Sequence, residues 1–144
     1  MGNDEAEALV RRLIEIGIGR GDESVIDELM APECVEHQRG NRNGIEGAKE
    51  VARTLNRWHS DFSLTVQDIV RSGDIVWTRN RAHGVNTGSV MGHPPTGRTI
   101  DLDVFDVVRL ENGKVVEHWG VADQMGMMMQ LGLMPGSGDR APTS

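Results

Sequence analysis

Apolar and polar residues alternate along residues 98–123, in two arms separated by a short polar segment. On the first arm, the apolar residues at even positions share one face of an extended strand: Ile100, Leu102, Val104, Val108 and Leu110. On the second arm, Val115, Trp119 and Val121 share a parity in the same way. The segment between the arms, Glu-Asn-Gly-Lys at residues 111–114, is typical of a tight turn. We therefore predict a β-hairpin.

The pattern before this hairpin changes from helical to alternating. Apolar residues recur at helical spacing in three segments, residues 3–19, 22–30 and 45–59. Alternation begins at Phe62 and predicts two further strands. The remaining boundaries are a strand to about residue 70, a strand over 75–86, a short extended piece at 34–37, a glycine-rich loop at 87–97 and a last helix or turn at 124–133.

Helices followed by a meander of strands indicate the α+β class. We expect a strongly curved antiparallel sheet of about four main strands, packed on three N-terminal helices to form a cone with an open mouth. Residues 1–135 are predicted to form a single domain. Residues 136–144, rich in glycine, serine and proline, are predicted to be a flexible tail.

The composition narrows the class of protein. The chain has 144 residues, 38% hydrophobic and 26% charged, with a formal net charge of −7. This balance fits one globular domain and argues against a nucleic-acid partner. The single cysteine, Cys34, excludes a disulfide within the chain, and the N-terminus lacks the features of a signal peptide. No apolar run approaches the roughly 18 residues that span a bilayer. We expect a cytoplasmic protein with no membrane contact.

One carboxylate stands among the apolar residues of the first arm. Asp106 shares the parity of that apolar face. Burying an unpaired carboxylate costs on the order of several kcal/mol, so Asp106 is paired, exposed near a bulge, or directed at a cavity. Asp123, at the end of the second arm, is the other acidic candidate.

Three segments of the chain carry a family likeness. Residues 113–135, GKVVEHWGVADQMGMMMQLGLMP, resemble the C-terminal stretch of SnoaL-like proteins, the polyketide cyclase family of the nuclear-transport-factor-like fold. Residues 87–100, TGSVMGHPPTGRTI, resemble the glycine- and proline-containing crossing of that family, and residues 35–37, Val-Glu-His, resemble its short histidine-bearing strand. The likeness implies the cone-shaped fold and an enzyme of polyketide antibiotic biosynthesis.

The resemblance also implies catalytic positions. Aldol cyclases of this family use a carboxylate shortly after the Gly-Lys hairpin as general acid and base, and that position matches Asp123. They also use a polar residue on the preceding strand, which matches Asp106. A histidine common in the wider family before Thr-Gly is Asn86 here. The implied reaction is an aldol-type cyclisation of a polyketide-like, polycyclic carbonyl compound, without a cofactor.

Aldol closure needs a base, a donor for the developing oxyanion, and a dry pocket that folds the substrate. We expect Asp123 to act as the base and Asp106 to donate a proton. The chain has no tyrosine, so an indole N–H, Asn86 or a histidine has to serve as the oxyanion donor.

His118 completes the predicted catalytic set with Asp123 and Asp106. Because His118 and Asp123 have opposite parities, we expect a bulge near Gly120 to bring both into one cavity. His59 follows a predicted helix and is expected to cap its end. The predicted substrate-binding residues are His37, Trp58, Trp119, Asn86 and Met91, with the two tryptophans as a flat wall for an aromatic ligand.

We expect no metal and no cofactor. The histidines lack ligand spacing, Cys34 stands alone, and the glycines of residues 87–97 do not form a phosphate-binding pattern. The expected partners are a small hydrophobic substrate and a second copy of the chain, because a homodimer would cover the open face of the sheet.

Other activities of the same fold stay open. An epoxide hydrolase would need a carboxylate pair linked by an arginine, for which Arg79, Arg81 or Arg109 are available. An isomerase, a cofactor-free oxygenase and a non-catalytic small-molecule carrier are further alternatives.

Overall fold

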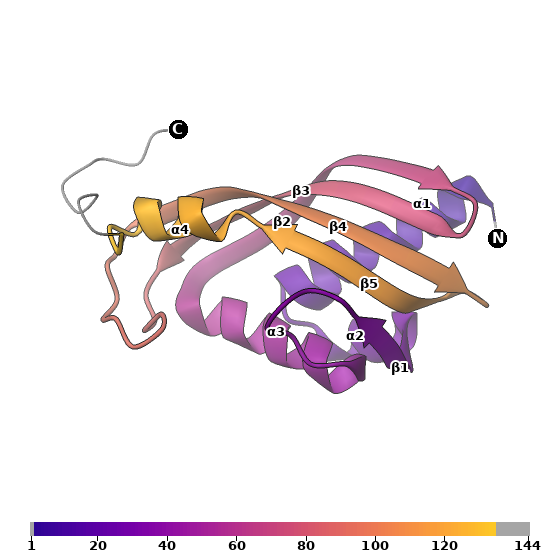
Figure 1. Ribbon diagram of the computed structural model, residues 1–144, viewed down its shortest axis with the longest axis horizontal. Helices are drawn as coiled ribbons and strands as arrows, with labels where there is room; N and C mark the ends of the chain where they lie inside the picture. Colours follow the sequence, from indigo (N-terminus) through magenta and orange to yellow (C-terminus); the bar gives the residue numbers. More distant parts are fainter. Residues whose placement is uncertain (1, 135–144) are drawn as a thin grey trace.

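The computed structural model describes residues 2–134. A curved five-stranded sheet carries helices against one face, which confirms the predicted α+β class (Figure 1). The elements are α1 (Asn3–Arg12), the π-helical η1 (Leu13–Gly19), α2 (Glu23–Leu29), β1 (Met30–Glu36), α3 (Gly44–Trp58), β2 (His59–Ser72), β3 (Ile75–Asn86), β4 (Thr99–Glu111), β5 (Lys114–Ala122) and α4 (Gln124–Gln130). The predicted tail, residues 136–144, lies outside the described residues.

Four of the strands form the antiparallel meander that the alternating pattern predicts. The order across the sheet is β1-β5-β4-β3-β2. The turn between β4 and β5 has positive φ at Asn112 and Gly113, 52° and 74°, as the preferred two-residue hairpin turn requires. Asp106 on β4 lies opposite Thr78 on β3 and Gly120 on β5. The register therefore places Asp106 within the sheet rather than at its edge.

The prediction of a four-stranded antiparallel sheet is corrected by a fifth strand, β1. The short extended piece predicted at residues 34–37 belongs to β1, which pairs in parallel with β5 and makes the sheet mixed. Pro32 has no N–H for a sheet ladder, but β1 is an edge strand, where proline is tolerated. The register of β1 shifts between Met30 and Val35. Beyond that shift, Glu36 lies beside His118.

The helices follow the predicted segments with two local differences. The first helix changes to π-helical geometry at Leu13. A Cβ atom on Gly19 would lie 3.1 Å from the Leu64 backbone nitrogen, so this glycine allows the helix to approach β2 closely. The third helix, α3, passes directly into β2, so β2 begins at His59 rather than Phe62. The predicted cap is confirmed, because both the backbone N–H and the Nδ1 of His59 hydrogen-bond the Leu55 carbonyl.

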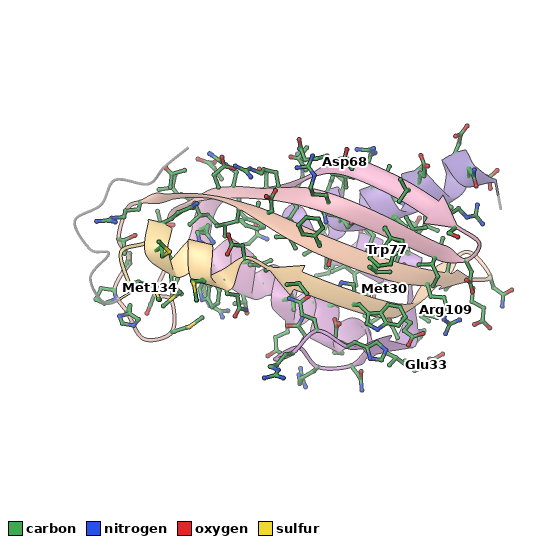
Figure 2. The ribbon with its side chains drawn as sticks, turned by 45° about the horizontal axis from the view of Figure 1, so that its top comes forward. Met30, Glu33, Asp68, Trp77, Arg109 and Met134 are labelled. Carbon is green, nitrogen blue, oxygen red and sulfur yellow. The ribbon has the colours of Figure 1, made fainter. Side chains whose placement is uncertain are left out.

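The two faces of the sheet differ in character. The buried apolar residues lie between the helices and the concave face. The outer face carries exposed Trp77 (Figure 2). Arg79, two residues further along β3 and so on the same face, pairs with Asp68. Within residues 2–134, none of the helices is long and apolar enough to cross a membrane.

Candidate functional site

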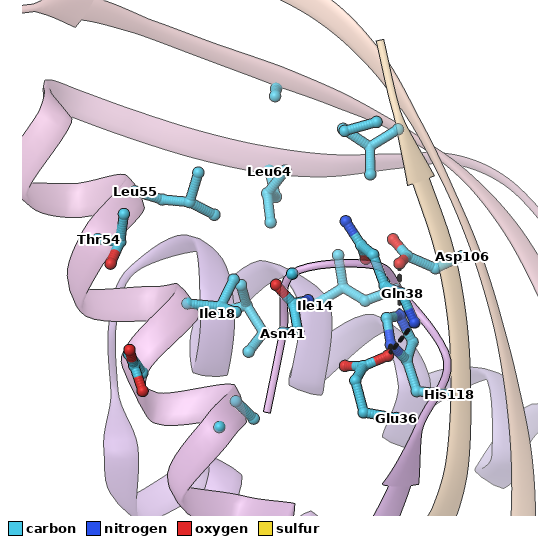
Figure 3. A pocket seen from close by; sticks show the side chains of 18 of the residues that line it. Ile14, Ile18, Glu36, Gln38, Asn41, Thr54, Leu55, Leu64, Asp106 and His118 are labelled. Atoms are coloured by element: carbon cyan, nitrogen blue, oxygen red, sulfur yellow. Dashed lines mark hydrogen bonds and ion pairs between the residues drawn. The ribbon is translucent and has the colours of Figure 1, made fainter. Parts of the chain in front are cut away.

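A cavity of about 400 Å³ lies between the concave face of the sheet and the helices, and Figure 3 shows it from close by. Its walls are mainly aliphatic and aromatic, as expected for a site that holds an apolar ligand. The apolar wall includes Ile14, Ile18, Leu55, Trp58, Phe62, Leu64, Ala82, Ile100, Leu102 and Val104. The polar residues of one end, Glu36, Gln38, Asp106 and His118, come from β1, the loop after it, β4 and β5.

His118 joins two carboxylates at this end of the cavity. Its Nε2 lies 2.7 Å from Oδ1 of Asp106, and its Nδ1 lies 2.7 Å from Oε1 of Glu36. The strand order explains the cluster, because β5 lies between β1 and β4 and carries the histidine between the two carboxylates. A carboxylate only accepts, so both ring nitrogens donate when the imidazole is protonated.

The two carboxylates determine the charge of His118. Burial favours the neutral ring, but the hydrogen bonds and charges of Asp106 and Glu36 outweigh it and raise the pKa of His118 to about 9. Burial also opposes ionisation of Glu36, yet its hydrogen bond and ion pair with His118 lower the pKa of that carboxyl. At neutral pH the cluster is therefore an imidazolium between two carboxylates.

The second oxygen of Asp106 is held by a buried amide. Asn80 Nδ2 donates to Asp106 Oδ2 at 2.7 Å and to Thr78 Oγ1 at 3.0 Å. Asn80 is fully buried on β3. The carboxylate of Asp106 is therefore held through both oxygens, by His118 on one and Asn80 on the other.

Gly120 makes room for this arrangement on β5. A Cβ atom at this position would lie 2.2 Å from Gln38 Oε1 and 2.8 Å from Asp106 Oδ1. The missing side chain lets Gln38 lie over the strand beside Asp106 (Figure 3). Any larger residue would crowd both of these groups and the His118 ring, whose Cε1 would lie 2.9 Å from the added atom.

Four of the predicted site residues line the cavity: Asp106, His118, Trp58 and Asp123. Asp123 lies beyond the end of β5 and is exposed, and its Oδ1 accepts the Gly126 N–H at the start of α4. The expected bulge at Gly120 is wrong, because β4 and β5 pair regularly there and their register shifts at Arg109–Leu110 instead. Asp123 reaches the cavity because the chain turns into α4.

The other four predicted residues do not line the cavity. His37 pairs with Glu117 and stacks on Trp119, with ring centroids 4.7 Å apart. Asn86 is buried, and its amide binds the Trp58 and Gly88 carbonyls and Thr96. Met91 is exposed in the loop between β3 and β4. The structure therefore does not bring these four residues into this cavity, and their role in substrate binding stays a prediction.

Sequence reasoning missed Glu36, Gln38, Asn80 and His59. Glu36 belongs to the Val-Glu-His segment, of which the sequence analysis predicts only His37 as a site residue. Adjacent strand residues point to opposite faces, and the sequence shows no signal for which of the two faces inward. Asn80 shares the even parity of Val76, Thr78 and Ala82 on β3, a signal that could have placed it on the inner face.

The arginines required by the hydrolase alternative lie elsewhere. Arg79 and Arg81 pair with Asp68, Asp101 and Asp103, and Arg109 pairs with Glu111 and Glu117. None of the three lines the cavity. Within residues 2–134, no group of three or more His, Cys, Asp or Glu side chains has an arrangement able to hold a metal ion.

Comparison with known proteins agrees with this fold. The sequence profile of the SnoaL-like polyketide cyclases matches residues 8–131. The chain therefore belongs to the SnoaL-like polyketide cyclase family.

Two relatives and two solved structures illustrate the similarity. Aklanonic acid methyl ester cyclase DauD of Streptomyces sp. (strain C5) is 27% identical over 128 residues, 86% of this chain and 80% of the relative. The cyclase DnrD of Streptomyces peucetius, named for the same substrate, is 27% identical over 86% of this chain and 88% of its own. TsrD from Streptomyces laurentii superposes with a TM-score of 0.85 at 27% identity, over 93% of this chain and 99% of its own. Wild-type IdmH from Streptomyces antibioticus superposes with a TM-score of 0.79 at 33% identity, over 88% of this chain and 98% of its own.

Proposed function

We propose that this protein is a polyketide cyclase that closes a ring by intramolecular aldol addition, with Asp106 as the group that moves the proton. The observation that carries the proposal is the position of Asp106. Its carboxylate lines an apolar cavity and is hydrogen-bonded to the imidazolium of His118 on one oxygen and to Asn80 on the other. Such a fixed, water-poor carboxylate suits general acid–base catalysis.

The proton balance of the reaction needs only one such group. The Asp106 carboxylate takes the proton from the carbon next to one carbonyl, which leaves an enolate and a carboxylic acid. The enolate carbon attacks a second carbonyl of the same molecule, and a carbon–carbon bond forms. The new alkoxide takes the proton back from Asp106. No proton is gained or lost overall, and no redox partner is needed.

His118 and Glu36 support this cycle electrostatically. The positive imidazolium donates a short, charge-assisted hydrogen bond to Asp106 Oδ1 and fixes the direction of that carboxylate. When the proton moves, negative charge passes from Asp106 to the substrate, and the imidazolium stabilises it at short range. Glu36 holds the second ring nitrogen at 2.7 Å and so keeps the ring charged and oriented.

The oxyanion also needs a neutral donor. Gln38 lines the same end of the cavity, beside Asp106 (Figure 3). Its carboxamide N–H is suited to a developing enolate oxygen. Asn86, an earlier candidate, is less suited because its amide already binds two carbonyls.

Asp123 stays a second candidate for the base. It lines the cavity, but it is exposed and caps α4 through Gly126. Asp106, by contrast, is held through both oxygens by His118 and Asn80 beside the apolar wall of the cavity. We therefore rank Asp106 ahead of Asp123.

The substrate class follows from the apolar walls and from the relatives. DauD and DnrD are named as cyclases of aklanonic acid methyl ester, and we propose a related polycyclic carbonyl compound for this chain. The test incubates the protein with aklanonic acid methyl ester in D₂O. We expect a product with one new carbon–carbon ring bond and an otherwise unchanged formula, and, where proton removal reverses before ring closure, deuterium next to the ketone of the recovered substrate. The proposal would be contradicted if the protein produced no ring closure and no deuterium exchange above the rate measured without protein.

A further inference from the structure

A second polar group lies on the cavity wall, apart from the Asp106–His118 end. His59 lines the cavity at the junction of α3 and β2 and is only 2% exposed. Its Nδ1 lies 3.2 Å from the Leu55 carbonyl oxygen. Its Nε2 is buried and has no hydrogen-bond partner within residues 2–134. A buried polar atom without a partner is costly and rare in folded proteins, so it calls for an explanation.

The partner of Nδ1 fixes the chemistry of Nε2. A carbonyl oxygen only accepts hydrogen bonds, so Nδ1 carries the ring proton. Burial lowers the pKa of His59, so the ring is neutral at neutral pH. The remaining nitrogen, Nε2, therefore presents a lone pair and can only accept.

The surroundings of His59 hold the ring in place. The Trp58 ring meets it edge-on, with centroids 6.4 Å apart and planes at 78°. The Phe62 ring stacks on it with centroids 5.7 Å apart. Both aromatic residues line the same cavity. His59 is thus a rigid acceptor set in an aromatic wall.

We propose that His59 Nε2 accepts a hydrogen bond from a hydroxyl group of the bound ligand, at the end of an aromatic substrate remote from its reacting carbonyls. The inference rests on the proposed function for the identity of the reacting end, but the binding step stands apart from turnover. A ketone or a methoxy group at the same position has no proton to donate and would leave Nε2 unsatisfied. His59 would therefore select hydroxylated, phenol-like rings over their ketone or ether analogues.

The other buried acceptor without a partner among the described side chains does not compete for this role. Asn80 Oδ1 is also unpartnered, but Asn80 does not line the cavity. At the other end of the cavity, Asp106 is also a hydrogen-bond acceptor, and a ligand hydroxyl could donate to it instead. The experiment must therefore separate the His59 end from the Asp106 end.

The test measures binding of 2-naphthol and 2-methoxynaphthalene, two probes of one ring system that differ in the hydroxyl proton. Wild-type protein should bind 2-naphthol about tenfold more tightly, the effect of one good hydrogen bond. His59→Asn keeps a donor near the Nδ1 position and removes Nε2, and should lose this preference while still binding 2-methoxynaphthalene. His59→Phe, which keeps an aromatic ring but has no ring nitrogen, should also lose the preference for 2-naphthol. Asp106→Asn is the matched control and should keep the preference.

Nitrogen NMR of the wild-type protein gives a second readout that needs no variant. The Nε2 resonance of His59 should move on addition of 2-naphthol and stay in place with 2-methoxynaphthalene. An unmoved resonance with bound 2-naphthol, or a preference that survives in His59→Asn and disappears in Asp106→Asn, would overturn the inference. Either result would leave the cyclase proposal untouched, since no turnover is measured.

Discussion

The Nε2 atom of His118 lies 2.7 Å from Oδ1 of Asp106, and this contact joins neighbouring strands β5 and β4 at the polar end of the cavity. Glu36 on β1 binds the other ring nitrogen at the same distance. Because the cluster is charged, the stability of the fold should depend on pH. Because its atoms are closely placed, single substitutions there should change activity.

Stability should fall at alkaline pH because of His118. Its folded pKa, raised to about 9, exceeds the ordinary value of 6.5. The histidine therefore stabilises the fold fully below about pH 6.5, and this contribution is lost as the pH rises through about 9. Urea unfolding between pH 6 and 10 should show a loss on the order of 2 kcal/mol in the wild type. His118→Gln should show a flatter profile, and identical slopes would refute the assignment.

Glu36→Gln should move the alkaline limit of activity to lower pH. The proposed mechanism requires a protonated His118, so kcat/KM should fall above about pH 9. Removing the Glu36 charge lowers the pKa of His118, since one of its two carboxylate partners is gone. The pH profile of ring closure checks this. Glu33→Gln on the same strand, whose side chain is exposed, is the control and should leave the limit in place.

Gly120→Ala should reduce turnover while the protein still folds. The added Cβ would lie 2.2 Å from Gln38 Oε1 and 2.8 Å from Asp106 Oδ1. Gln38, the proposed oxyanion donor, can move aside, but neither it nor the Asp106 carboxylate would then keep its position. We expect kcat to fall at least about tenfold, since a misplacement of about 1 Å is costly to catalysis. Thermal melting accompanies the assay, and a fully active variant would show that Gln38 and Asp106 need not pack over position 120.

The outer face of the sheet is predicted to form a homodimer. Trp77, Phe105 and Val121 are 55%, 52% and 71% exposed. Phe105 lies opposite Val121 in the β4–β5 register, so these residues form part of one surface. Light scattering should give a dimer for the wild type and a monomer for Trp77→Glu with Phe105→Glu. Met125→Glu, an exposed site on α4, should remain dimeric. A monomeric wild type would exclude this interface.

Much of the fold follows from local patterns in the sequence. The alternation of Ile100 to Leu110 and the turn at Asn112–Gly113 determine the hairpin, and this register places Asp106 inward. The pairing of β1 with β5 could not be read from the chain, because it joins residues about eighty positions apart through a proline-containing edge. The role of Glu36 depends on that pairing and was missed with it.

The candidate site shows the same division. Asp106 and His118 were found because each is a polar residue in a patterned strand. Asp123 follows the hairpin at the expected distance, but a helix that begins there uses its carboxylate as a cap. The sequence predicts His59 as a helix cap. It could not predict that Nε2 of His59 lacks a partner within residues 2–134, because this depends on the tertiary packing around the ring.

The most direct test of the account compares Asp106→Asn with Asp123→Asn in one assay of ring closure. Both changes keep the side chain's shape and remove its ability to accept a proton. Asp106→Asn should lower kcat by about 10²–10⁴-fold, the usual contribution of a general base, with melting curves showing that the protein is folded. Asp123→Asn should retain most of its activity, because an exposed capping residue has a milder role. A folded Asp106→Asn variant with full turnover, or a collapse of kcat confined to Asp123→Asn, would contradict the central claim.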